Sequence, residues 1–321
     1  MKPAQRMYGR AQSNDVSNLI NVEQPVIVCD EVRRIFAGRY PGFNFNRLDQ
    51  LFSDTADLFE GRWTGYRACD TPYHDLRHTL DVTLALARLI DGHDYTRPLA
   101  EHLGPERALL GVACALFHDS GYMLEERDTA HRHGAEYTLI HVSRSAELLS
   151  HYLPRIGLAA HVQVAAEIVH YTGYERPFDT IKLRDRRDQI LGFMLGTADL
   201  IAQMSDRAYL EKCRDYLFEE FVHAGIAHEA LPDGRIRVTY DSPADLLFKT
   251  REFFQHIALP RLDQEFEGVY RFAGAHFAGN NHYVDEIALN FAHLGKVIDA
   301  KDVGLLRRQC NTLALRDAVA N

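Results

Sequence analysis

Apolar residues recur through most of the chain at the three- and four-residue intervals that are typical of amphipathic helices. Within 74–91 they fall at positions mostly compatible with one helix: Leu76, Leu80, Val82, Leu84, Leu86 and Leu89. Pro105 marks the start of a second helix that continues through His118, because proline is favoured in the first helical turn. Similar patterning predicts further helices over 133–152, 158–171, 186–204, 206–224, 243–256, 261–276 and 284–296.

Strand signal is thin and is clearest in residues 231–240. There a Pro-Asp-Gly turn precedes Arg235 to Tyr240, where apolar and polar residues alternate with a period of two. We therefore expect one small β-hairpin inserted into an all-α protein that is otherwise a helical bundle.

The pattern also divides the chain into three parts. Residues 1–24 are polar, and we expect them to be poorly ordered or to form a docking arm. A helical domain over 25–225 is expected to carry the chemistry, with a helical C-terminal extension over 226–321 packed on it. In that extension, the polar turn 277–283 could close over a pocket or contribute to a dimer interface.

The amino-acid composition and the net charge argue against some classes of protein. Hydrophobic residues make up 46% of the 321 residues and charged residues 25%, which is ordinary for a globular protein with a sizeable core. The net charge of −9 argues against a general nucleic-acid binder, but it leaves a small phosphorylated substrate open, since a metal can reverse the local field. The longest apolar run, 108–117, is too short to span a bilayer, and the N-terminus lacks the apolar core of a signal peptide. Five scattered cysteines without a CxxC pair indicate reduced thiols in a cytoplasmic protein.

Histidines and aspartates occur in three segments with metal-ligand character. In the first, His74 and His78 are four residues apart and would share one helix face, with Asp81 placed to accept the second ring N–H of a ligating histidine. In the second, the adjacent His118 and Asp119 follow an apolar helix, where a buried carboxylate needs a positive partner.

The third segment is an apolar helix interrupted by Asp199, which also needs a partner if it is buried. Each segment has a simpler interpretation when taken alone. The histidine pair could be exposed on an amphipathic helix, Asp119 could lie beside an exposed helix end, and Asp199 could form a buried salt bridge.

In combination, the three segments resemble the HD superfamily of metal-dependent phosphohydrolases over roughly residues 60–205. The stretch from Tyr73 to Val82 is also similar to the Tyr-His-Asn-x-x-His-x-x-Asp-Val signature of cyclic-nucleotide phosphodiesterases, with Asp75 in place of the asparagine. The resemblance implies an HD-type helical bundle. It also implies that one metal is held by the set His78, His118, Asp119 and Asp199.

The resemblance implies a catalytic role for two residues. His74 matches the general acid that protonates the leaving oxygen. A metal-bound hydroxide would attack phosphorus, with Asp119 bridging or orienting it. Tyr122 departs from the family, since it stands where phosphodiesterases have a histidine and where bacterial HD proteins often have a phosphate-contacting lysine. That departure bears on the substrate more than on metal binding.

A second metal is the next expectation, because binuclear members of the superfamily insert two histidines between the ligands already named. His141 and His170 stand at about these places, and His133 competes with His141 for the role. The alternative is that these histidines are core or surface residues bonded to backbone. One or two divalent ions are therefore expected, from manganese, iron, zinc, nickel, cobalt or magnesium.

Substrate contacts are less constrained by the sequence. Arg77, Arg176 and Lys182 are candidates for binding phosphate, although a charged loop such as 182–188 is usually just solvated. Three aromatic residues could form one wall of a ring pocket, although such residues more often belong to the core: Tyr171, Tyr174 and Phe178.

Three functions fit these patterns. The first is hydrolysis of a phosphodiester or phosphomonoester in a nucleotide or another small phosphorylated substrate, without a nucleic-acid polymer or a membrane as partner. The second is a mixed-valent di-iron oxygenase, since some binuclear HD proteins cleave carbon bonds with dioxygen. The third is a regulatory binding module, which the full set of four ligands disfavours. A homodimer is compatible with all three.

Overall fold

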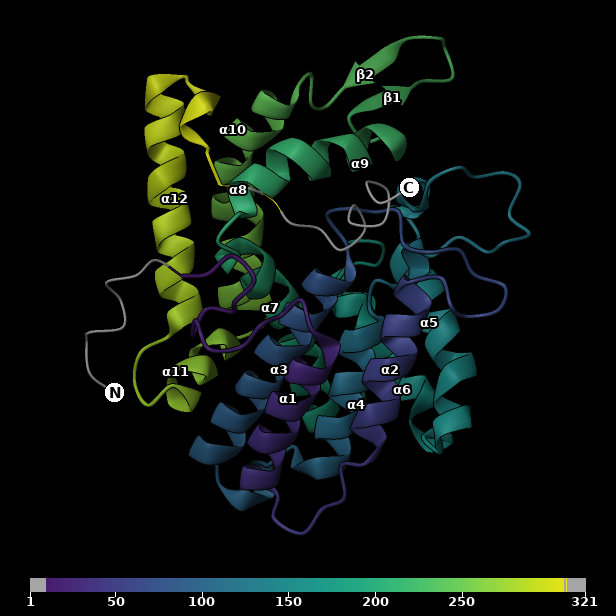
Figure 1. Ribbon diagram of the computed structural model, residues 1–321, viewed down its shortest axis with the longest axis vertical. Coiled ribbons are helices and arrows are strands. Elements are labelled where there is room, and N and C mark those ends of the chain that lie inside the picture. The colour runs from purple at the N-terminus through teal and green to yellow at the C-terminus, as the bar shows by residue number, and fades with distance from the viewer. Residues whose placement is uncertain (1–9, 309, 311–321) are drawn as a thin grey trace.

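Helices account for nearly all of the regular structure in the computed structural model, which describes residues 10–308 and 310 (Figure 1). The all-α prediction with one small hairpin is therefore confirmed. The helices are α1 (Pro25–Arg39), α2 (Arg47–Phe59), α3 (Leu76–Thr96), α4 (Gly104–Phe117), α5 (His141–Tyr152), α6 (Val162–Ile168), α7 (Arg186–Ser205), α8 (Tyr209–Lys212), α9 (Phe218–His223), α10 (Pro243–Phe253), α11 (Phe272–His276) and α12 (His282–Ala300). The strands are β1 (His228–Ala230) and β2 (Ile236–Val238).

Helix α3 is the central element of the bundle. Almost all of its residues are buried, including polar ones, as expected for a helix that is covered on every side. It packs against α1, α4, α7 and α11. Gly92 permits the contact with α11, because a Cβ atom there would lie 1.9 Å from the carbonyl oxygen of Phe272.

The start of α3 corrects one expectation from the sequence. The helix begins at Leu76 rather than at 74, because the side chain of Asp75 caps it by accepting a hydrogen bond from the His78 N–H at 2.9 Å. His74 therefore lies before the helix, and helical spacing does not relate it to His78.

Several predicted helices are shorter or interrupted. The predicted helix 133–152 contains a 3₁₀ turn at Gly134–Tyr137 and becomes α-helical only at His141. The region 206–224 is divided by a π-helical segment, Cys213–Leu217. In 261–276, Glu267 and Gly268 have positive φ angles of 53° and 68°, and this left-handed turn interrupts the helix. Periodicity alone does not reveal such breaks, because the apolar spacing continues across them.

The hairpin is present, with both strands shorter than the predicted segment. β1 and β2 pair in antiparallel register, with Glu229 opposite Arg237, and the Pro-Asp-Gly segment forms the connecting turn. The side chains of Ile236 and Val238 are exposed. The hairpin therefore adds little to the core.

The described part of the N-terminal arm, residues 10–24, is packed on the bundle, which agrees with the docking arm and not with poor order for this part. Val16 and Val22 are buried, and the buried carboxylate of Asp15 pairs with the buried guanidinium of Arg88 on α3. Residues 1–9 lie outside the described residues.

In the C-terminal part, α11 packs on α3 and α12 packs on α7. Across the described residues, no helix combines the length and apolarity that crossing a membrane requires.

Candidate metal centre

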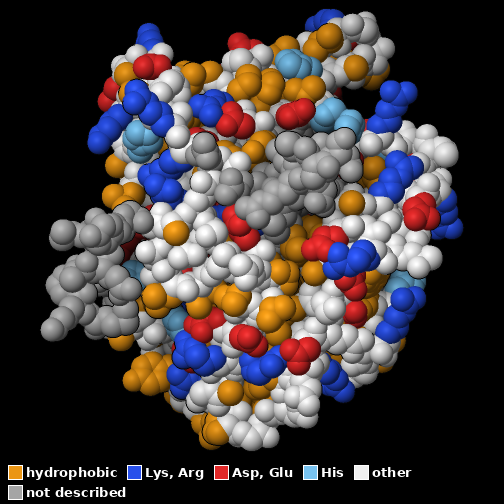
Figure 2. Space-filling view, viewed as in Figure 1, with side chains coloured by type: hydrophobic (Ala, Val, Ile, Leu, Met, Phe, Trp, Pro, Cys, Tyr) orange, Lys and Arg blue, Asp and Glu red, His pale blue; other side chains and the backbone are white. Residues whose placement is uncertain are grey.

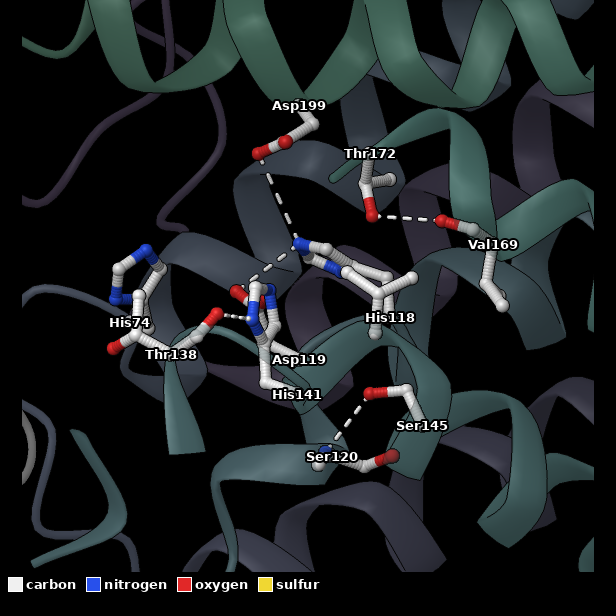
Figure 3. A network of polar contacts seen from close by, with 12 residues as sticks. His74, His118, Asp119, Ser120, Thr138, His141, Ser145, Val169, Thr172 and Asp199 are labelled. Atoms are coloured by element: carbon white, nitrogen blue, oxygen red, sulfur yellow. Dashed lines mark hydrogen bonds and ion pairs between the residues drawn. The ribbon is translucent and has the colours of Figure 1, made fainter. Parts of the chain in front are cut away.

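Four of the predicted ligands converge at one point from three helices. Figure 3 shows three of them, His118, Asp119 and Asp199. His78 comes from α3, His118 and Asp119 follow the end of α4, and Asp199 comes from α7. The Nε2 atom of His78 lies 3.2 Å from Asp199 Oδ1 and 3.5 Å from Asp119 Oδ2. The Nε2 atom of His118 lies 3.1 Å from Asp119 Oδ2 and 3.8 Å from Asp199 Oδ1. All four residues are buried.

Two atoms in this cluster lack hydrogen-bond partners although they are buried: His118 Nε2 and Asp119 Oδ2. The other ring nitrogen of His118, Nδ1, lies 2.8 Å from the carbonyl oxygen of Ala115 and can only donate to it. In the neutral ring, Nε2 then carries a lone pair that faces the carboxylate of Asp119. Two acceptors facing each other in a buried site are costly unless a cation lies between them. The donor set therefore fits a divalent metal, and His78, His118 and Asp119 lie close enough together to hold one.

The electrostatics support the same conclusion. Burial lowers the pKa of His118, but the carboxylates of Asp119 and Asp199 outweigh burial and raise it to about 9. Burial raises the pKa of Asp119, but His118 and two further histidines outweigh burial and hold it well below its usual range. Without a metal, a proton on His118 partly balances the two carboxylates. A divalent ion would do so while leaving the imidazole neutral.

His141 approaches the same aspartate from the opposite side. Its Nε2 atom lies 3.7 Å from Asp119 Oδ1, whereas Oδ2 faces His78 and His118. Its Nδ1 atom is 2.7 Å from the Thr138 carbonyl oxygen, so Nε2 is again free to act as a ligand. The two oxygens of Asp119 therefore face different histidines, and His141 with Oδ1 could contribute to a second metal.

The start of α5 places His141 beside Asp119. Gly121 allows the close approach, because a Cβ atom there would lie 1.8 Å from the His141 carbonyl oxygen. The Gly121 N–H donates to Ser145 Oγ at 2.8 Å, and Arg144 donates to the carbonyl oxygens of Gly121 and Met123. Three hydrogen bonds between two short segments therefore fix α5 against the turn that follows His118 and Asp119.

The other candidate ligands differ in position. His170 is buried in a 3₁₀ turn after α6, burial lowers its pKa, and its Nδ1 atom has no hydrogen-bond partner. Among the described residues, no ion pair joins His170 to the cluster. His133 is exposed, with its ring 4.0 Å from that of His223 and its Nδ1 atom 3.7 Å from Asp70. The structure thus brings His141, and not His133, to Asp119.

His74 lies beside the cluster and is held by a residue that sequence reasoning missed. Its Nδ1 atom is 2.6 Å from Oε2 of Glu220 on α9, and Oε1 of Glu220 accepts the Tyr73 N–H at 2.6 Å. Burial lowers the pKa of His74, but Glu220, Asp119 and Asp199 outweigh it and raise the pKa to about 9. Glu220 is 146 residues from His74 and is preceded by another glutamate, so nothing in the sequence distinguishes it from a surface residue.

Asp81 does not contact a ligating histidine directly. It is buried near His78, its Oδ1 atom has no partner, and burial raises its pKa to about 6. The two side chains line the same small internal cavity. For His118 and His141, backbone carbonyls take the supporting role that was expected of a carboxylate.

The three predicted phosphate contacts are engaged elsewhere. The buried guanidinium of Arg77 pairs with Asp206 and donates to the Gln12 carbonyl oxygen. Arg176 pairs with Glu167, and the exposed Lys182 donates to the carbonyl oxygen of the nearby Asp179. The structure therefore does not bring Arg176 or Lys182 to the cluster. Arg77 lines the same small cavity as His78, but its guanidinium is paired with Asp206.

The predicted aromatic wall is divided between core and surface. Tyr171 is buried and packs against Phe178, which also stacks on Phe193. Tyr174 is exposed, and the guanidinium of Arg261 lies over its ring at 4.3 Å. Tyr171 and Phe178 therefore follow the core interpretation, and only Tyr174 remains available to a ligand.

Comparisons of the chain with protein-family models, with curated proteins and with solved structures found no match.

Proposed function

We propose that this protein is a metal-dependent phosphohydrolase of the HD superfamily that acts on a small phosphate ester. The observation that carries the proposal is the buried cluster of His78, His118, Asp119 and Asp199, in which His118 Nε2 and Asp119 Oδ2 have no hydrogen-bond partner. Such a cluster is costly as a structural element and useful as a cation site.

These four residues would hold one divalent ion, and His141 with Asp119 Oδ1 would contribute to a second. A bound divalent ion supplies Lewis acidity and activates water at neutral pH. Imidazole and carboxylate ligands accept manganese, iron, zinc, nickel, cobalt or magnesium, so availability decides which is bound. His170 is the further candidate for the second ion, on the strength of its buried, unpartnered Nδ1 atom.

His74 would act as the general acid. With its pKa raised to about 9, it is protonated at neutral pH and can donate from Nε2 while Nδ1 remains bonded to Glu220. A proton donor is most useful for a poor leaving group such as an alkoxide. This favours ester hydrolysis over a reaction that has no oxygen leaving group.

A small phosphorylated substrate, rather than a nucleic-acid polymer, completes the proposal. On the face shown in Figure 2, basic and acidic side chains are interspersed and do not form one continuous basic patch. The net charge of −9 points the same way. Free thiols at all five cysteines agree with the reducing cytoplasm as the proposed location.

The second candidate function is a di-iron oxygenase. The observation in its favour is the divided environment of Asp119, with Oδ1 toward His141 and Oδ2 toward His78 and His118. Two irons per chain, a near-ultraviolet band from a bridged iron pair and substrate-dependent oxygen uptake would support it.

The proposal is tested by measuring hydrolysis of bis(p-nitrophenyl) phosphate by the manganese-loaded protein. We expect turnover in the wild type, no turnover in Asp119→Ala and a strong decrease in His74→Ala. His133→Ala is the matched control, because this exposed histidine contacts His223 and Asp70 rather than the cluster. Equal activity in His74→Ala and His133→Ala would remove His74 from the mechanism, and an inactive wild type that holds metal would contradict the hydrolase.

A further inference from the structure

Tyr122 contacts two functional histidines at once. Its side chain is buried, and its ring centroid lies 4.7 Å from that of His74 and 4.3 Å from that of His141. The ring planes are close to parallel in both pairs, at 23° and 17°. The His74 and His141 centroids are themselves 6.3 Å apart, so the three rings form a compact triangle of offset contacts.

The backbone around Tyr122 fixes the position of its ring. The Tyr122 N–H donates to the Asp119 carbonyl oxygen at 3.1 Å, so the tyrosine belongs to the same turn as the central carboxylate. The Gly121 N–H is bonded to Ser145 Oγ, and Arg144 binds the carbonyl oxygens on either side of Tyr122. A ring fixed in this way restricts the orientation of the side chains that pack against it.

The orientation of the His74 ring depends on such a packing contact. The only hydrogen bond of its ring among the described residues runs from Nδ1 to Glu220, and one hydrogen bond tolerates a range of angles, so the ring can still tilt. The direction of Nε2, from which a proton would be donated, is then not fixed by Glu220 alone. The Tyr73 ring meets the His74 ring at 66°, with 5.0 Å between their centroids, whereas the nearly parallel face of Tyr122 restricts the tilt.

We propose that Tyr122 is a positioning residue that aligns the ring of His74 with the metal centre and seats His141 through the same aromatic contact. This inference rests on the proposed function for the role of His74, whereas the placement of the two rings can be tested without any activity. An aromatic ring is required at this position, and the hydroxyl group is dispensable.

The placement is tested by NMR of the zinc-loaded protein. Ring-proton resonances of His74 and His141 would be assigned with His74→Gln and His141→Gln, and their shifts compared in the wild type, Tyr122→Phe and Tyr122→Leu. We expect the shifts of both histidines to be the same in the wild type and Tyr122→Phe and to change in Tyr122→Leu, although the ring current of Tyr73 still acts on His74. If the leucine variant does not fold, nuclear Overhauser contacts from the Tyr122 ring to both histidines in the wild type decide the question, and their absence overturns the proposal.

The catalytic consequence is tested with two substrates. General acid catalysis matters more for diphenyl phosphate than for bis(p-nitrophenyl) phosphate, because phenolate is the poorer leaving group. In Tyr122→Leu we expect kcat to fall about tenfold or more for diphenyl phosphate but at most about threefold for the nitrophenyl ester, with Tyr122→Phe close to the wild type. An equal decrease for both substrates, or unmoved histidine shifts in Tyr122→Leu, overturns the proposal. A metal-loaded wild type that hydrolyses neither ester contradicts the proposed function instead, and the shifts alone then decide the role of Tyr122.

Discussion

The ring nitrogens of the histidines show how single contacts prepare this site. A backbone carbonyl oxygen lies at Nδ1 of both His118 and His141, namely that of Ala115 and of Thr138. Each carbonyl fixes the proton on Nδ1 and leaves Nε2 to act as a ligand. His74 differs, because its Nδ1 atom faces a carboxylate, which favours the protonated ring. The group at Nδ1 therefore distinguishes the candidate metal ligands, which face a carbonyl oxygen, from the candidate general acid, which faces a carboxylate.

At this scale we predict the effect of Glu220→Gln on the pH dependence of activity. A general acid works only while it is protonated, so activity falls as pH rises through the pKa of His74, which lies at about 9. Removing the Glu220 charge lowers this pKa toward the ordinary value of about 6.5. The alkaline limb of the profile of kcat against pH is expected to move to lower pH in the manganese-loaded variant.

Glu219→Gln is the control for this prediction, since the neighbouring carboxylate is exposed and has no contact with His74. Its profile should match that of the wild type. An alkaline limb that stays in place in Glu220→Gln would show that His74 is not the titrating acid.

Among the elements, the junction of α5 with the turn after α4 positions His141, the candidate ligand of a second metal. We predict that Gly121→Ala forces these elements apart, because its Cβ atom would lie 1.8 Å from the His141 carbonyl oxygen. The expected cost is about 1–3 kcal/mol in the free energy of unfolding, as for other overpacked sites. The displaced His141 should also weaken binding of a second metal, measured as manganese per chain.

Gly38→Ala provides the comparison, because a Cβ atom at this position of α1 meets no heavy atom within 4 Å. Alanine is favoured over glycine within a helix, so stability should be unchanged or rise by up to about 1 kcal/mol. If both variants hold the same amount of metal as the wild type, the tight contact at Gly121 does not position His141.

Secondary structure was predicted best where a run of neighbouring residues decides it. The apolar runs of α4 and α7 and the turn of the hairpin are local features, and their positions agree with the sequence to within a few residues. The start of α3 was misplaced because the capping role of Asp75 was not recognised, although an aspartate before an apolar run is a known signal. The π-helical segment Cys213–Leu217 has no such signal, since it depends on packing between distant elements.

For the whole molecule, a buried ionic contact ties three distant parts of the chain together. Arg88 on α3 pairs with Asp15 of the N-terminal segment and donates to the Tyr283 hydroxyl oxygen of α12 at 2.9 Å. Burial raises the pKa of Asp15, but Arg88 and hydrogen bonds from Ile20 and Ser17 outweigh burial and lower it overall. The contact joins the N-terminal segment and the C-terminal extension to the central helix.

We predict that Asp15→Asn destabilises the fold by about 3–5 kcal/mol at neutral pH, because it leaves the Arg88 charge buried without its partner. The folded pKa of Asp15 is lowered, so its contribution is present above the unfolded value of about 3.9 and is lost as pH falls through the folded value. Chemical denaturation at pH 7 measures the difference. Glu229→Gln, which breaks the exposed pair with Arg237 on the hairpin, should cost at most about 1 kcal/mol. Similar small costs for both variants would contradict the role given to Asp15.

The long-range contacts mark the limit of what this sequence predicts. The four candidate ligands could be named because the three segments in combination resemble the HD superfamily, although each segment has a simpler interpretation alone. The roles of Glu220 and Asp15 could not be predicted, because the sequence around each acidic residue does not show that it pairs with a distant residue. Their roles follow only from the packing of α9 and of residues 10–24 on the bundle.

Metal-dependent hydrolysis is tested most directly by titrating chelator-stripped protein with manganese. Bound metal and hydrolysis of bis(p-nitrophenyl) phosphate are measured on the same samples. We predict that the stripped protein is inactive and that turnover rises in step with bound metal. Asp119→Asn should bind little metal and stay inactive throughout, because it removes the charge shared by both halves of the centre. Full turnover in the stripped protein, or none in wild-type protein saturated with metal, would contradict the account.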